Sequence, residues 1–290
     1  MATNTPFGQR LGLVLEGGAM RGIYTAGVLD VFLEAGIMPD VVVGVSAGAL
    51  HGCSYVAGQK GRSIRYYRKY RSDKHFMGLY SLLTTGDVVG TKFCYEDIPL
   101  RLDPFDEAAF EKAPVDFYVT VTNVRTGKPE YILCDELKVG SKMDVIRAGA
   151  SMPLCSKMVE WNGNLYLDGG VSDSIPYAKM KDFGCRKSIV VLTQPAGYLK
   201  QPAAMAPFEA MYRKYPAFVE AMRGRDQMYN TEVCAVEQAA KQGDVFLICP
   251  SKLLHVGRME HDIEVLNAQY ELGRQDARNQ MDAMREWMER

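Results

Sequence analysis

Residues 40–50 read Asp-Val-Val-Val-Gly-Val-Ser-Ala-Gly-Ala-Leu, and this stretch decides the fold of the chain. A run of β-branched residues comes first, and small helix-forming residues follow. The pattern predicts a buried strand that passes through a tight Gly-x-Ser-x-Gly turn into a helix. Such a turn strains the backbone of Ser46 and pushes its hydroxyl out beyond the carboxyl end of the strand. Gly44 and Gly48 are expected because a Cβ atom at either position would collide with the neighbouring chain. Ser46 is therefore the first candidate for a nucleophile.

The residues before this turn predict another unit of strand followed by helix. Residues 10–15 form a short apolar run, residues 16–22 are rich in glycine, and residues 23–35 have a helical pattern that ends at Gly36. Residues 40–45 and 47–57 repeat the order of strand and helix. Two such units in succession predict a parallel sheet that is covered by helices on both faces.

The rest of the chain extends the same architecture. Residues 116–122 and 129–134 predict a strand pair around Arg125-Thr126-Gly127, and residues 187–193 and 244–249 predict two more strands. Long, charged, helix-prone segments cover residues 207–223, 226–242 and 260–290. Because a strand lies between these helices, we expect residues 1–290 to form one domain. Its motif-bearing core would span about 10–193, and its C-terminal helical region about 200–290.

Composition narrows the class of protein. The 290 residues are 47% hydrophobic and 24% charged, with a net charge of -1, which is typical of a globular protein and gives no overall field for nucleic acid. No apolar stretch is long enough to span a membrane, and no secretory signal is recognisable. The seven cysteines are scattered without Cys-x-x-Cys spacing. We therefore expect a cytoplasmic protein with reduced thiols, no metal, no cofactor and no nucleic-acid partner. The oligomeric state stays open.

The glycine-rich loop is the second element with chemical meaning. It reads Glu16-Gly17-Gly18-Ala19-Met20-Arg21-Gly22, between a predicted strand and a predicted helix. Successive N–H groups in such a loop can converge on a phosphate or on the oxyanion of an ester intermediate. A Walker loop would need Lys-Ser or Lys-Thr after Gly22, and a Rossmann fingerprint would need glycine at Ala19. A plain glycine turn for helix packing is the alternative, but two adjacent glycines with an arginine favour an anion site.

The third element is Leu165-Tyr166-Leu167-Asp168-Gly169-Gly170. It predicts a short strand that ends in an aspartate, with two glycines that let the carboxylate approach another loop. Such a carboxylate can serve as the partner of a nucleophile. From these residues alone, an ordinary Asp-Gly turn is the more frequent meaning.

Together the three elements carry a resemblance. Gly-Gly-Ala-Met-Arg-Gly at 17–22, Gly-Val-Ser-Ala-Gly at 44–48 and Asp-Gly-Gly at 168–170 resemble the patatin-like phospholipase family in order and separation. Residues 150–154 resemble it too, and the C-terminal helices are similar to a bacterial subgroup. The resemblance implies a three-layer α/β/α fold with a mostly parallel central sheet. It also implies that Ser46 is the nucleophile and Asp168 its base, in a dyad without histidine.

The resemblance further implies roles for the loop and a class of substrate. Gly17, Gly18 and Ala19 would donate N–H groups to the oxyanion, and Arg21 would steady the loop or the anionic head of a lipid. The protein would be a serine acyl hydrolase of phospholipids, lysophospholipids or simpler lipid esters. Many members have a third glycine where this chain has Ala19, so a negative φ there would preserve the oxyanion hole and a positive φ would impair it.

The dyad sets a physical condition. An aspartate with its ordinary pKa of about 3.9 is a poor base for a hydroxyl at neutral pH. Burial must raise the pKa of Asp168, or the transition state must be strongly stabilised elsewhere. We therefore expect a partly dry, apolar cleft at the mouth of the sheet, suited to acyl chains.

Two other functions remain open. One is an α/β-hydrolase triad, in which His255 or His261 would complete the order Ser46, Asp168, His. Against the triad, only one strand precedes the nucleophile strand, and a lone surface or core histidine is more common. His51 would lie about 140° around the helix from Ser46, and His75 lies in a basic, aromatic segment. The other alternative is a catalytically idle lipid-binding protein, which would not need this combination of residues.

Residues 60–74 contain seven basic residues and one acidic residue, interleaved with Tyr66, Tyr67 and Tyr70. One interpretation is a docking face for phospholipid headgroups, which would place the protein transiently at a membrane surface. The residues favour the other interpretation, a solvated basic helix whose tyrosines pack inward.

Overall fold

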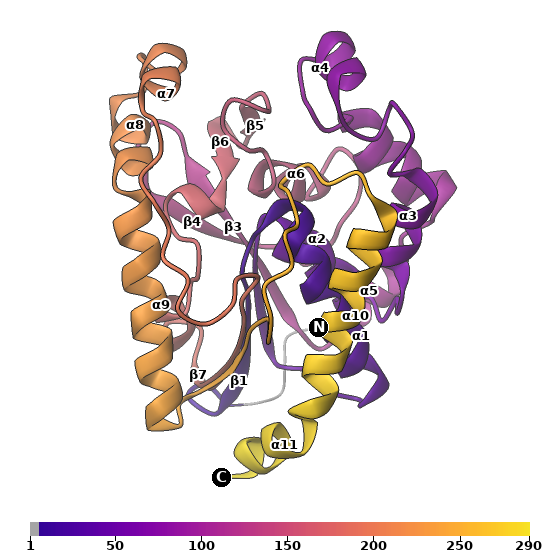
Figure 1. Cartoon of the computed structure of the whole chain (residues 1–290), viewed down its shortest axis with the longest axis vertical. Coiled ribbons are helices and arrows are strands. Elements are labelled where there is room, and N and C mark those ends of the chain that lie inside the picture. Colours follow the sequence, from indigo (N-terminus) through magenta and orange to yellow (C-terminus); the bar gives the residue numbers. More distant parts are fainter. Residues whose placement is uncertain (1–5) are drawn as a thin grey trace.

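The computed structural model of the chain describes residues 6–290, which form a central sheet between two layers of helices (Figure 1). Within these residues the sheet has eight strands, in the order β5-β6-β3-β2-β1-β7-β8, and β4 pairs with β3. The five neighbours from β3 to β8 run parallel, whereas β4 and β6 are antiparallel to β3, and β5 to β6. The strands are β1 (Arg10–Leu15), β2 (Val41–Val45), β3 (Asp116–Asn123), β4 (Pro129–Leu133), β5 (Val159–Trp161), β6 (Asn164–Asp168), β7 (Cys185–Val191) and β8 (Val245–Ile248).

Side chains of the central strands point alternately to the two faces of the sheet, and each face is covered by a layer of helices. Leu13 and Leu15 of β1 join one buried cluster with α1 (Ile23–Glu34), α2 (Ala47–Val56), α6 (Met143–Gly149) and α10 (Ile263–Asn279). Val14, between them, joins another cluster with α9 (Arg225–Gln242). The predicted three-layer α/β/α fold with a mostly parallel sheet is therefore confirmed.

The remaining helices lie around these layers. They are α3 (Arg62–Tyr70), α4 (Leu79–Thr85), α5 (Glu107–Lys112), α7 (Ala206–Met211), α8 (Pro216–Arg223) and α11 (Met281–Glu289). Four short helical segments are η1 (Ala19–Gly22), the π-helical η2 (Phe93–Leu102), η3 (Gly169–Val171) and η4 (Ala178–Lys181). Across residues 6–290, none of the helices has both the length and the apolar character needed to cross a membrane.

Two of the predicted long helices are broken. The segment 207–223 forms α7 and α8, and α8 begins at Pro216. Proline lacks a backbone N–H and restricts the residue before it, so Tyr215 takes a non-helical conformation and one continuous helix cannot form. The segment 260–290 forms α10 and α11, which meet at Gln280. No proline or glycine marks this second break.

Helix α10, which precedes the last helix α11, packs closely against α1, the first long helix of the chain (Figure 1). A Cβ atom at Gly27 would overlap the carbonyl oxygen of Tyr270, and one at Gly273 would overlap that of Tyr24. The hydroxyl of Tyr270 donates a hydrogen bond to Asp30 at 2.6 Å, which fixes the register of the two helices. Glycine on both helices lets the backbones approach, and the polar pair then aligns them.

Candidate active site

Ser46 lies at the turn between β2 and α2 and has φ 53° and ψ -123°. Positive φ is strained for a residue with a Cβ atom, so the expected distortion at the turn is present. A Cβ atom at Gly44 would come within 2.5 Å of the Ala49 Cα, and one at Gly48 would overlap the carbonyl oxygen of Leu15. Both obstacles are backbone atoms that cannot swing away. The steric reason predicted for the two glycines is therefore confirmed.

Asp168 reaches Ser46 through the antiparallel pairing of β6. Asp168 lies opposite Val121 of β3, and the preceding residue of β3, Thr120, lies opposite Val45 of β2. The last residue of β6 is thus level with the turn that follows β2. As a result the Ser46 Oγ donates a hydrogen bond to the Asp168 Oδ2 over 2.6 Å.

Backbone and side-chain groups hold Asp168 in place. Its side chain is 6% exposed, and its Oδ1 accepts a hydrogen bond from the N–H of Gly170 at 2.8 Å. Gly169 begins η3, and the Thr122 hydroxyl donates to the Asp168 carbonyl at 2.8 Å. Burial raises the pKa of Asp168, and the hydrogen bond from Ser46 and the charge of Arg225 oppose this only in part. The pKa therefore moves in the direction that a general base needs.

The glycine-rich loop faces the same space. Gly17, Gly18 and Ala19 line a cavity together with Ser46 and Asp168. Within residues 6–290 no group accepts a hydrogen bond from the N–H of Gly17, Gly18 or Ala19. Within the described residues these N–H groups are unpartnered, and the residues that carry them line the cavity beside Ser46.

Ala19 has φ 50°, the positive value for which the sequence analysis expected an impaired loop. A left-handed conformation costs an alanine about 1 kcal/mol relative to glycine. The cost is borne as backbone strain, and the Ala19 N–H still has no acceptor among residues 6–290. Arg21 lines the same cavity, and its N–H donates to the carbonyl of Gly18 at 3.1 Å.

Glu16 is a part of the site that the sequence analysis did not single out. It is 4% exposed, and its Oε2 accepts hydrogen bonds from the N–H of Thr193 at 2.5 Å and from its hydroxyl at 3.0 Å. The Thr193 hydroxyl also lies 3.0 Å from the carbonyl oxygen of Gly17. Thr193 thereby ties the start of the loop to the segment after β7. The only signal in the sequence was an acidic residue directly after a buried strand.

Two cavities meet at Ser46. The first encloses about 920 Å³ of empty space, including its open mouth, and its lining is mostly apolar. The lining includes Leu50, Tyr67, Phe76, Ile98, Met143 and Ile146. The second cavity is lined by the loop, by Asp168 and by several cationic side chains, and it shares Ala19, Ser46 and Met152 with the first. The expected apolar cleft is therefore present, on one side of the serine.

Within the described chain, none of the four histidines forms a hydrogen bond with Ser46 or Asp168. His51 is buried, and its Nδ1 lies 3.0 Å from the Ser63 hydroxyl. Burial lowers the pKa of His51 to about 4. His75 pairs with Asp73, and the side chains of His255 and His261 are exposed. Among residues 6–290, no histidine is placed to complete a Ser-Asp-His triad.

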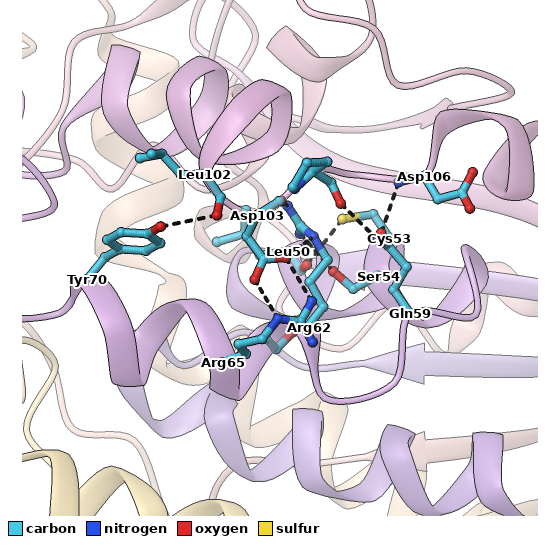
Figure 2. Close-up of polar contacts among 12 residues, drawn as sticks. Leu50, Cys53, Ser54, Gln59, Arg62, Arg65, Tyr70, Leu102, Asp103 and Asp106 are labelled. Atoms are coloured by element: carbon cyan, nitrogen blue, oxygen red, sulfur yellow. Dashed lines mark hydrogen bonds and ion pairs between the residues drawn. The ribbon is translucent and has the colours of Figure 1, made fainter.

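The basic segment 60–74 contains α3, and its tyrosines pack inward as the sequence favoured. Tyr66, Tyr67 and Tyr70 are at most 9% exposed. Figure 2 shows Arg62 and Arg65 both directed at Asp103, where Arg65 makes two hydrogen bonds at 2.6 Å and 2.8 Å. Two of the seven basic residues are therefore paired with Asp103, which weakens α3 as a docking face for lipid headgroups.

Other groups of possible chemical importance are dispersed. Among residues 6–290, no three or more His, Cys, Asp or Glu side chains are placed to hold a metal ion. The seven cysteines are free thiols, and Cys155 lines the second cavity.

Comparison with known proteins assigns the family. A family model described as patatin-like phospholipase matches residues 13–180, which is more than half of the chain. The chain therefore belongs to the patatin-like phospholipase family. A second model, of a domain of unknown function, matches residues 215–289.

The chain is similar to proteins from bacteria and fungi. It is 28% identical over 273 residues to the uncharacterized protein YjjU of Escherichia coli, covering 91% of this chain and 75% of YjjU. It is 30% identical over 182 residues to lysophospholipase nte1 of Aspergillus terreus, covering 61% of this chain and 11% of that protein. It therefore spans a small part of the length of the fungal relative. Among solved structures, VipD from Legionella pneumophila aligns with a TM-score of 0.48 and 13% identity, over 96% of this chain and 67% of that one.

Proposed function

We propose that this protein is a serine acyl hydrolase that cleaves carboxylic ester bonds of lipids, with Ser46 as nucleophile and Asp168 as base. The observation that carries the proposal is the 2.6 Å hydrogen bond from the Ser46 Oγ to the Asp168 Oδ2. It lies beside unused N–H groups and at the mouth of an apolar cavity. Membership of the patatin-like phospholipase family and similarity to proteins named lysophospholipases support a lipid ester as substrate.

The chemistry follows from the positions of these groups. The Ser46 Oγ attacks the ester carbonyl while its proton passes to the Asp168 carboxylate. The N–H groups of Gly17, Gly18 and Ala19 stabilise the negative oxygen of the tetrahedral intermediate. Collapse of the intermediate breaks the ester bond, and the departing alcohol takes the proton from Asp168. Water then attacks the acyl-enzyme and gives a proton to Asp168. Asp168 passes this proton to the Ser46 Oγ as the fatty acid leaves, which restores the serine hydroxyl and the carboxylate.

The apolar cavity supplies a place for the acyl chain. Its lining contains aromatic and aliphatic side chains from α2, α3, η2 and α6. Transfer of an acyl chain from water into such a lining is favourable by about 0.8 kcal/mol for each buried methylene group. Exclusion of water by the chain also keeps Asp168 in the dry surroundings that raise its pKa.

Transient contact with a membrane surface is part of the proposal, but α4 supports it better than α3. Leu79 and Leu83 of α4 are 70% and 76% exposed. Met77 and Val89 flank the segment that contains α4. They pair through an isolated β-bridge, and both line the apolar cavity. The exposed leucines thus adjoin the cavity that would receive a lipid chain. A lipid surface is the occupant that suits this position, because the substrate must leave such a surface to enter.

We also infer that the chain forms one domain, as the sequence led us to expect. The close packing of α10 on α1, and the place of β8 in the same sheet as β1, support this arrangement. The cytoplasmic location stays a prediction.

The test combines covalent labelling with ester hydrolysis. A fluorophosphonate probe should label Ser46 of the wild-type protein, with the site mapped by mass spectrometry. Asp168→Asn should lower turnover of a p-nitrophenyl ester by about 100-fold to 10,000-fold, because the proton acceptor is lost. His255→Ala and His261→Ala are matched controls that should keep most of the activity.

If a histidine variant loses activity and Asp168→Asn retains it, the result contradicts the Ser-Asp dyad and favours a triad that includes that histidine. Absence of both labelling and turnover in a folded wild-type protein would favour the idle lipid-binding alternative. Circular dichroism and thermal melting of each variant separate loss of chemistry from loss of fold.

A further inference from the structure

The second cavity at Ser46 contains an excess of positive charge. It encloses about 1030 Å³ of empty space, including its open mouth, and four cationic side chains line it: Arg21, Lys200, Arg225 and Arg258. Within residues 6–290, none of the four has a carboxylate oxygen within ion-pair distance. Four cations that outnumber the two carboxyl groups of one cavity are costly to hold together, and the cost is relieved by a bound anion.

The hydrogen bonds that these side chains do make leave most of their donors available. The Arg225 Nε donates to the carbonyl oxygen of Gly170 at 2.5 Å, which orients the guanidinium beside Asp168. The Lys200 ammonium lies 3.8 Å from the centroid of the Tyr229 ring. The Nε of Arg21 is buried and has no hydrogen-bond partner among the described residues. An unpartnered buried guanidinium nitrogen at a cavity wall is the second sign of a missing ligand.

The two carboxyl groups in the cavity do not balance this charge. Glu16 is engaged by Thr193, and Asp168 is engaged by Ser46 and Gly170. Burial raises the pKa of both carboxyl groups, and even with both ionised the four cations of the lining leave positive charge in excess. Burial, followed by the charge of Arg225, lowers the pKa of Lys200 to about 7. Burial is the largest cause of all three pKa changes, and the neighbouring positive charges oppose it at the two carboxyl groups and add to it at Lys200.

The position of the cavity identifies the part of a substrate that it would receive. The acyl chain would occupy the apolar cavity, so the alcohol portion of the ester would lie in the cationic one. Arginine forks match phosphate oxygens in pairs, and lysine adds a point charge. A quaternary ammonium would meet four cations, and one of the aromatic rings that line the cavity, that of Tyr229, already carries Lys200.

We propose that this cavity is a subsite for a phosphate group without an attached ammonium, so that lipid esters with a phosphomonoester head are preferred over those with phosphocholine. This inference rests on the proposed ester hydrolase function and names the substrate within it. Three of the four cations lie beyond the region matched by the patatin-like phospholipase model. Arg225 and Arg258 lie in residues 215–289, so the C-terminal region would determine headgroup specificity.

The test compares three esters with one acyl chain in common: lysophosphatidic acid, lysophosphatidylcholine and the neutral monoacylglycerol. For wild type, kcat/KM should be at least about tenfold higher with lysophosphatidic acid than with lysophosphatidylcholine. Lys200→Met and Arg258→Gln should raise KM for lysophosphatidic acid about tenfold more than they raise KM for monoacylglycerol. Arg225 and Arg21 are not substituted, because they contact Gly170 and the glycine-rich loop.

Matched controls come from the same region of the chain. Lys214→Met and Arg213→Gln remove the same charges at exposed positions that do not line the cavity. They should leave the headgroup preference intact. Equal or better turnover of lysophosphatidylcholine by wild type would overturn the inference, as would a phosphate preference that survives both cavity substitutions.

A binding measurement separates this inference from the proposed function. Calorimetry on Ser46→Ala should show lysophosphatidic acid binding that weakens about tenfold when Lys200→Met is added. That result supports the subsite even if no ester is hydrolysed, in which case only the proposed function fails. Inorganic phosphate is the second ligand in the same experiment. If it binds as tightly as lysophosphatidic acid, the cavity serves free phosphate, and the headgroup assignment is wrong.

Discussion

Ala19 and Ser46 both have a positive φ, which residues with a Cβ atom rarely adopt, with values of 50° and 53°. Both line the two cavities of the site, one in the glycine-rich loop and one at the turn after β2. At Ser46 the strain accompanies the exposure of the hydroxyl to Asp168. At Ala19 a glycine would adopt the same conformation without strain, so the strain there is separable from the chemistry.

Ala19→Gly should therefore stabilise the protein. We expect the free energy of unfolding to rise by about 1 kcal/mol, because glycine removes the cost of positive φ. Urea denaturation measures this change. Ala235→Gly, at an exposed position inside α9, is the control and should lower stability by about 1 kcal/mol. A loss of stability in Ala19→Gly would contradict the strain at residue 19.

Asp168→Asn should make the protein more stable near neutral pH while it removes activity. The pKa of Asp168 is raised in the folded chain, so the folded state binds this proton more tightly than the unfolded state does. The contribution of Asp168 to stability is therefore fully present at low pH and is lost as pH rises through the raised pKa. A pKa that is higher by one in the folded state than in the unfolded state corresponds to about 1.4 kcal/mol of unfolding free energy.

Urea unfolding of both proteins between pH 5 and pH 8 measures this effect. The stability advantage of Asp168→Asn should be largest at the alkaline end and shrink as the pH falls. If Asp168→Asn is less stable than wild type at every pH, the hydrogen bonds and charge interactions of the Asp168 carboxylate stabilise the fold by more than burial of its charge destabilises it.

Replacing the exposed leucines of α4 should reduce contact with lipid surfaces. Leu79→Ser together with Leu83→Ser removes two large apolar side chains, so sedimentation with phospholipid vesicles should fall at least about tenfold. Hydrolysis of a short, water-soluble ester should be unchanged. Met38→Ser is the control, since Met38 is 38% exposed and precedes the amino end of β2, away from the site. Equal sedimentation of all three proteins would remove α4 as the contact.

The charge of Lys200 should give the headgroup preference a pH dependence. The pKa of Lys200 is about 7, lowered first by burial, then by Arg225, Arg21 and Arg258, with Glu16 opposing. Lys200 is cationic below this pH and neutral above it. The measured quantity is the ratio of KM values for lysophosphatidic acid between Lys200→Met and wild type, because titration of the substrate cancels in that ratio. It should be large at pH 6 and approach one by pH 8.5; a flat ratio would contradict a role for the ammonium charge.

The elements that the sequence analysis predicted correctly depend on neighbouring residues. The strand at residues 40–45, the turn at Ser46 and the helix after it follow from β-branched residues, two glycines and small residues in succession. The requirement for Gly44 and Gly48 could also be predicted, because the crowding arises within a few residues or against the adjacent strand β1. The helix predicted over 207–223 was wrong at the point where Pro216 interrupts it.

The partners of Ser46 depend on contacts that no local pattern contains. Residues 165–170 alone favoured an ordinary turn, and only the antiparallel pairing of β6 with β3 brings Asp168 level with Ser46. Lys200 and Arg258 come from loops far apart in the chain, and nothing around them in the sequence marks them as neighbours of Ser46.

The sequence by itself thus determined the strand-turn-helix units and, through the resemblance of its three motifs, the family and the fold. Only the tertiary structure decided which carboxylate meets the serine, which face receives an acyl chain, and where the unpaired cations gather. The physical reason is the distance along the sequence over which each kind of interaction acts. Backbone conformation is set by steric and hydrophobic patterns over a few residues, whereas a site made from residues more than 100 positions apart is set by strand pairing and by the packing of whole helices.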